Sequence, residues 1–153
     1  MSIEQAIFDW VDTAWAADTG AGGIAPTASG NARVRFLWRT GEKQPDTPNW
    51  PAVVVSVVSS HDDPIGGSSA GTSESATAVL TFTIITDRIP SSLTKQNAVA
   101  DRLKVLFGKT TPTTALGWSF SRTLRLRGFQ GPMTSDRIHW IEQYHVLGTY
   151  TYS

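Results

Sequence analysis

The spacing of apolar residues along the chain predicts two helices. Over residues 3–17, apolar side chains recur every three or four positions, and Ser2 and Gln5 stand at capping-box spacing, which is typical of an amphipathic helix. A second apolar stripe extends from Val99 to Phe107 and ends at Gly108, which indicates another helix.

Five further segments have the composition of β-strands. Apolar and polar residues alternate over residues 33–39, 76–86 and 118–127, and a final strand is expected over residues 138–152. Residues 52–58 carry valine on both faces, which predicts a central strand covered on both sides for part of its length. These elements predict an α+β fold: a single, mostly antiparallel sheet of about five strands with two helices packed on it.

Two segments have little to bury. Residues 61–75 form a long inter-strand loop in which only Ile65 is strongly apolar, and residues 19–49 are rich in glycine and proline. Loops of that length are uncommon in a compact domain and are usually functional or disordered. We therefore expect one domain over residues 1–153, with a flexible loop at 61–75 that contacts another surface.

Composition narrows the classes of protein that fit. The chain has 153 residues and no cysteine, which excludes disulfides, thiolate zinc sites and cysteine nucleophiles. Its formal net charge is zero, which disfavours a general nucleic-acid or membrane-surface binder and favours self-association. We expect neither a signal peptide nor a membrane-spanning segment.

Charge is nevertheless distributed unevenly along the chain. Residues 1–32 carry four carboxylates, at Glu4, Asp9, Asp12 and Asp18, and no lysine or arginine. Residues 102–137 carry seven basic residues against Asp136 alone. This asymmetry favours head-to-tail contact between copies, although charged faces in contact with water alone would show the same pattern. The candidate interface residues are Glu4, Asp9, Asp12, Trp50, Arg122, Arg125 and Arg127.

Two of these candidates have specific arguments. Alternation places Arg122 on the apolar face of its strand, where a guanidinium needs a carboxylate partner. The alternative is a position at the rim of the sheet, with the head group in water. Trp50, between Asn49 and Pro51 at a strand entry, is a candidate interface anchor.

No arrangement of residues supports catalysis. The segment from Gly67 to Gly71 matches the Gly-x-Ser-x-Gly pattern of hydrolases around Ser69, but that chemistry needs a turn between a strand and a helix, and here both flanks are rich in Ser and Gly. His61, Asp62 and Asp63 lack a companion cluster of metal ligands. We expect no enzyme, no cofactor and no metal site.

A nucleic-acid-binding module is a different possibility, because arginines line two of the predicted strands. They are Arg33, Arg35 and Arg39 on one strand and Arg125 and Arg127 on another. The aromatic residues of these strands alternate to the opposite face, and the net charge is zero, so a subunit interface fits the arginine rows better.

The order of elements matches a known family. An N-terminal helix precedes a proline-rich entry into a valine strand over residues 48–55 and a long strand ending at residues 86–88. A helix over residues 97–107 and two closing strands follow. In this order, best matched over residues 52–152, the chain resembles the tail terminator, or tail completion, proteins of long-tailed bacteriophages, also described as minor tail proteins. Residues 19–49 are longer and richer in Gly and Pro than is usual for that family.

The resemblance implies a structural virion protein without enzymatic activity. Such proteins form a ring, of six subunits in the known members, on the head-proximal end of the tail tube. The ring ends tube polymerisation and offers a docking surface to the neck, and DNA passes through its lumen without specific binding. The implied partners are other copies, the tail tube protein and a head-completion or neck protein, with assembly in the host cytoplasm. A tail tube or head-to-tail connector subunit is the alternative.

The loop after the valine strand is the candidate contact with the tube or the neck. Its candidate contact residues are His61, Asp62, Asp63, Ile65 and Glu74. An exposed edge or long hairpin of this kind can bind another subunit by strand addition.

Overall fold

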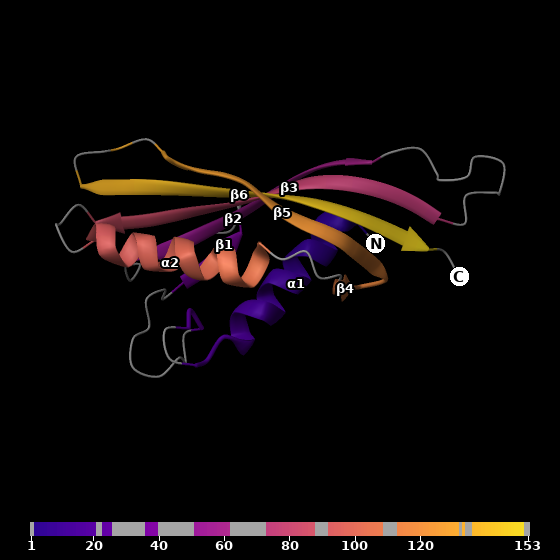
Figure 1. The fold of residues 1–153 in the computed structure, drawn as a ribbon, viewed down its shortest axis with the longest axis horizontal. Coiled ribbons are helices and arrows are strands. Elements are labelled where there is room, and N and C mark those ends of the chain that lie inside the picture. Colours follow the sequence, from indigo (N-terminus) through magenta and orange to yellow (C-terminus); the bar gives the residue numbers. More distant parts are fainter. Residues whose placement is uncertain are drawn as a thin grey trace.

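A computed structural model describes most of the chain (Figure 1). The described residues are 2–20, 23–25, 36–39, 51–61, 73–87, 92–108, 113–131, 133 and 136–151. The elements, in chain order, are α1 (Ile3–Ala17), β1 (Phe36–Arg39), β2 (Ala52–His61), β3 (Ser73–Asp87), α2 (Ser92–Phe107), β4 (Thr113–Ala115), β5 (Trp118–Gln130) and β6 (Arg137–Thr151).

The strands form one six-stranded sheet in the order β1-β2-β3-β6-β5-β4. β1 is parallel to β2, and every other neighbouring pair is antiparallel. Both helices lie on the same side of the sheet (Figure 1). The α+β architecture expected from the sequence is therefore confirmed, with two layers, one of helices and one of strands.

The core lies between these two layers. Alternate residues of β3, from Ala76 to Ile84, are buried beneath the helices. Phe82 stacks on Phe107 of α2 with 5.0 Å between ring centroids, and the ring centroid of Trp15 in α1 lies 6.5 Å from that of Phe82. Burying one large aromatic side chain contributes about 1.5–3 kcal/mol, so this shared ring ties both helices to the sheet.

The first helix has the bounds that the sequence predicts. The Ser2 hydroxyl accepts a hydrogen bond from the backbone N–H of Gln5 at 3.2 Å, which satisfies one of the free donors at the helix start. The apolar stripe is buried against the sheet and consists of Ile3, Ala6, Ile7, Val11 and Trp15. The helix ends at Ala17, and the chain leaves it through a turn that brings Gly23 against the backbone of Asp18.

That turn requires glycine at one position. A Cβ atom at residue 23 would lie 2.1 Å from the carbonyl oxygen of Asp18, a separation that real Cβ atoms do not show. At Gly20, by contrast, no atom lies within 4 Å of the position that a Cβ would take. The glycine-rich stretch that ends the helix thus contains at least one position fixed by close packing.

Most strand boundaries differ from the predicted ones, and β5 extends to Gln130 rather than ending at Arg127. β2 reaches His61 and β3 begins at Ser73, so the loop between them is residues 62–72 rather than 61–75. β4 is a short strand that was not predicted from the sequence. Leu116 (φ 49°) and Gly117 (φ 84°) form a tight turn that folds it back on β5. The final strand is Arg137–Thr151.

Coverage of the valine strand changes along its length. Ala52 and Val53, on opposite faces, are both fully buried, as the sequence predicts for part of the strand. By Val58 the face opposite the helices is open, and this side chain is 72% exposed. One layer of helices cannot cover both faces, so in the described structure one face of the sheet is half-exposed. We call it the open face.

β5 does not alternate as predicted. Its register with β6 shifts between Phe120 and Arg122 and again between Arg125 and Arg127. Phe120 pairs with Gly148 and is buried in the core. The backbone of Arg122, two residues later, pairs with Leu147, which is only one residue from Gly148 in β6. The strict alternation predicted for this strand is therefore broken, because each bulge inserts a residue and shifts which residues share a face. The side chain of Arg122 lies outside the described residues, so the face predicted for it stays a prediction.

Candidate assembly surfaces

The acidic helix α1 presents two of its predicted carboxylates to solvent. Asp9 and Asp12 are exposed on the side opposite the buried stripe. Glu4 is half-buried and accepts a hydrogen bond from the hydroxyl of Ser59 in β2. The intermolecular role predicted for Glu4 is untested, but this carboxylate already has a partner within the chain.

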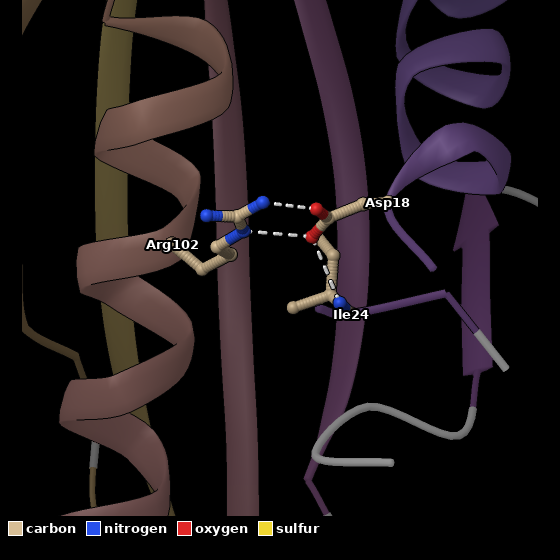
Figure 2. Close-up of polar contacts among 3 residues, drawn as sticks. All are labelled: Asp18, Ile24 and Arg102. Carbon is tan, nitrogen blue, oxygen red and sulfur yellow. Dashed lines mark hydrogen bonds and ion pairs between the residues drawn. The ribbon is translucent and has the colours of Figure 1, made fainter. Parts of the chain in front are cut away.

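The fourth carboxylate of the acidic segment is not at the surface. Asp18 is 6% exposed and forms an ion pair with Arg102 of α2 (Figure 2). The guanidinium Nε donates to Oδ2 at 2.8 Å and Nη2 donates to Oδ1, while the backbone N–H of Ile24 donates to Oδ2 at 2.9 Å. The Arg102 guanidinium holds the pKa of Asp18 below its usual value, and the hydrogen bond that Arg102 donates to Asp18 raises the pKa of Arg102.

This contact is a clamp between elements. It joins the end of α1 to the middle of α2 and fixes residues 23–25 beside them (Figure 2). The carboxylate is satisfied by donors on both oxygens, so the cluster has a structural role and leaves little capacity for chemistry. In the sequence these two charges belong to the acidic and the basic segment, and the structure pairs them within one subunit.

The arginines of β5 occupy one margin of the sheet. The side chains of Arg122 and Arg125 lie outside the described residues, and their backbones pair with Leu147 and Tyr144. Arg127 is exposed, and its Nε donates to Oε1 of Gln143 at 2.8 Å. Its guanidinium carbon also lies 4.9 Å from the centre of the Phe129 ring.

Arg127 belongs to the open face. Its partner Gln143 donates in turn to the hydroxyl of Thr81 at 3.4 Å, on the face of β3 that the helices do not cover. Most described residues on this face are β-branched, aliphatic or neutral polar, and the same face also carries His139, His145 and the paired Asp87 and Arg137. Arg127 and the exposed carboxylates of α1 thus lie on opposite layers of the molecule.

Several predicted contact residues can now be placed only in part. His61 is the last residue of β2 and Glu74 the second of β3, so both belong to the sheet rather than to a loop. Asp62, Asp63 and Ile65 lie outside the described residues, as do Trp50 and Ser69. Their predicted roles stay predictions.

The histidines of β6 do not converge on a common site. His139 pairs with Ile85 and His145 with Val79, so they lie on the open face at separate rows of the sheet. Among the described residues, no three or more His, Cys, Asp or Glu side chains are grouped so that they could hold a metal ion. No helix in the same part of the chain is long and apolar enough to cross a membrane.

Sequence reasoning missed two buried polar residues. Glu142 is fully buried and accepts a hydrogen bond from Nε1 of Trp140 at 2.7 Å. Gln96 is buried at the start of α2, and its amide donates to the carbonyl oxygens of Ile84 and Ile138 at 3.3 and 3.5 Å, which joins α2 to two strands. The burial of Glu142 could have been predicted from the sequence, because it lies two residues from Tyr144 in an alternating strand and therefore on the same face.

Comparisons with known proteins give a relationship of fold. No protein-family model matches the sequence, and no curated protein matches it. Among solved structures, one match is a chain of the virion of a native gene transfer agent particle, with a TM-score of 0.63. The match covers 97% of this chain and 95% of the other, at 11% sequence identity. The two chains therefore share a fold over nearly their whole lengths.

Proposed function

We propose that this chain is a structural subunit of a phage-like virion and that it acts through its surfaces rather than through an internal reaction site. The observation that carries this proposal is the fold match, which extends over 97% of the chain to a chain of a gene transfer agent virion. The order of elements, which resembles that of phage tail terminators, supports the same conclusion independently of the match.

The specific role that we propose is that of a tail terminator. In this role the chain forms a ring, six subunits by analogy with the family, at the head-proximal end of the tail tube. The ring ends tube polymerisation and presents a docking surface to the neck, and DNA passes through it. The support is the resemblance together with the distribution of charge over the two layers.

That distribution favours a head-to-tail contact between copies. Asp9 and Asp12 face outward from the helical layer, whereas Arg127 lies on the open face of the sheet. Within one copy these charges point away from each other, so they can meet only between copies. A contact between two different surfaces closes into a ring when its rotation divides a full turn.

Charge reversal on α1 tests the proposed contact. In a variant carrying Asp9→Lys and Asp12→Lys, the carboxylates that face Arg127 of the next copy become cations, so we expect ring formation to fall by at least tenfold in sedimentation and electron microscopy. The matched control is Lys95→Glu, on an exposed position of α2. Further reversal of Arg127→Glu in the double variant should restore part of the assembly.

Two outcomes would contradict the proposal at different levels. Rings that form equally well after charge reversal on α1 would exclude this contact and leave the terminator role standing. Stacked tubes in place of single closed rings would identify a tube subunit and contradict the terminator role itself.

A further inference from the structure

The outer edge of β2 is covered over only part of its length. β1 pairs with β2 from Ala52 to Val55, and no described residue pairs with the same edge from Ser56 to His61. On its other side β2 pairs with β3 in an unbroken register as far as His61. In the part of the chain that the structure describes, β2 therefore continues for six residues beyond β1, and one row of its backbone donors and acceptors faces outward without a neighbouring strand.

This edge carries none of the usual protections against pairing. Its sequence, Ser-Val-Val-Ser-Ser-His, has no lysine, no proline and no carboxylate, and its register contains no bulge. Natural proteins usually protect such edges with charges, prolines or bulges. β5, which β4 covers only from Trp118 to Phe120, has two register shifts and three arginines. The sheet therefore has one edge that is suited to pairing and one that is not.

Exposed apolar surface accompanies the suitable edge. Val58 is 72% exposed and lies opposite Val79 on the open face. It borders a shallow hollow of about 200 Å³ whose other lining residues are Ser59, Thr77, Ala78, Val79 and His145. A strand added to β2 would place its own side chains beside Val58 and cover this surface.

We propose that the β2 edge pairs antiparallel with the same edge of a second copy, about a two-fold axis at Val58. A head-to-tail extension of the sheet would join two different edges, and both would have to be suited to pairing. This sheet has one such edge, so pairing of the β2 edge with the same edge of a second copy is favoured. Residues directly opposite each other in antiparallel strands share a face of the sheet. A two-fold axis perpendicular to the sheet therefore places the helical layers of both copies on the same side of the joined sheet. Centring the axis on Val58 packs the two exposed valines together and ends the paired segment, Ser56 to Ser60, before β1.

This contact is independent of the proposed terminator role. It uses neither α1 nor the arginines of β5, so a subunit can carry both contacts. The uncharged edge and the zero net charge of the chain impose no repulsion between copies.

Cysteine cross-linking tests the contact and its register. The chain contains no cysteine, so Val58→Cys introduces a single thiol that forms a disulfide only with another copy. The matched control is Val105→Cys on α2, because Val105 is 56% exposed. Under mild oxidation we expect the dimer of the Val58 variant to form at least tenfold faster than that of the control. Equal rates for the two variants would overturn the proposal.

A charged substitution provides the second test. In the background of Asp9→Lys and Asp12→Lys, in which the ring contact is weakened, Val58→Lys places like charges opposite each other at the axis. The concentration-dependent dimer of that background should therefore be lost in analytical ultracentrifugation, whereas Val105→Lys should leave it unchanged. A monomeric unmodified protein would overturn the proposal. If the unmodified protein were monomeric and Val58→Lys abolished its binding to tail tubes, the β2 edge would pair with a strand of a tube subunit instead of with a second copy. The proposed terminator role would then still stand.

Discussion

At the scale of single residues, the ion pair between Asp18 and Arg102 has the clearest consequences. It joins residues 84 positions apart in the chain, so no local pattern could reveal it. Sequence reasoning identified both charges and their uneven distribution, but it could not show which of them cancel within a subunit. Of the four carboxylates in the acidic segment, the structure leaves Asp9 and Asp12 exposed.

Removing the guanidinium should destabilise the fold. In Arg102→Ala the carboxylate of Asp18 stays buried without its cation, so we expect a loss of about 2–3 kcal/mol in the free energy of unfolding. Lys104→Ala, which breaks the exposed pair with Asp101, is the matched control and should cost less than about 1 kcal/mol. Urea denaturation measures both, and equal losses would contradict the structural importance of the Asp18 pair.

The same pair should make stability depend on pH. Because Arg102 lowers the pKa of Asp18 in the folded state below the reference value of 3.8, the stabilisation is fully present above pH 3.8. It is lost as the pH falls through the lower, folded-state pKa. The stability difference between the unmodified protein and Asp18→Asn should therefore shrink below pH 3.8. A constant difference in denaturation experiments from neutral pH to pH 2.5 would show that ionised Asp18 does not stabilise the fold.

At the scale of elements, sequence patterns predicted some segments closely and others poorly. α1 has its predicted bounds because both its cap and its apolar stripe are local features. β3 likewise shows the predicted alternation, with Ala76, Leu80 and Ile84 among its buried residues. In β5 the bulges reverse the alternation, and a bulge depends on pairing with a distant strand. The parallel pairing of β1 with β2 is also a property of topology rather than of local sequence.

The proposed contact between α1 of one copy and the open face of the next should be sensitive to salt. Exposed charges a Debye length apart are screened, and that length falls from about 10 Å at 0.1 M to about 3 Å at 1 M. We therefore expect the fraction of protein in rings to fall across this range in sedimentation velocity experiments. The unfolding free energy of the monomer should change less, because Asp18 is buried. Ring formation that is unchanged in 1 M salt would exclude charge as the main source of affinity between copies.

At the scale of the whole molecule, the fold was predictable from the sequence, and the assembly stays a prediction. Two amphipathic helices and one mostly antiparallel sheet give a two-layer arrangement, which the structure confirms. Both helices lie on one face, so the other face and the β2 edge remain as large surfaces in the described structure. Which surface binds which partner depends on contacts between chains. A single sequence indicates such contacts only indirectly, through charge asymmetry and exposed strand edges.

The most direct test of the account is electron microscopy of the purified protein mixed with tail tubes of the proposed virion. We predict single closed rings that sit at one end of each tube and stop its growth. Tubes that bind the protein along their sides, at both ends or not at all would contradict the claim that this chain is a ring-forming cap.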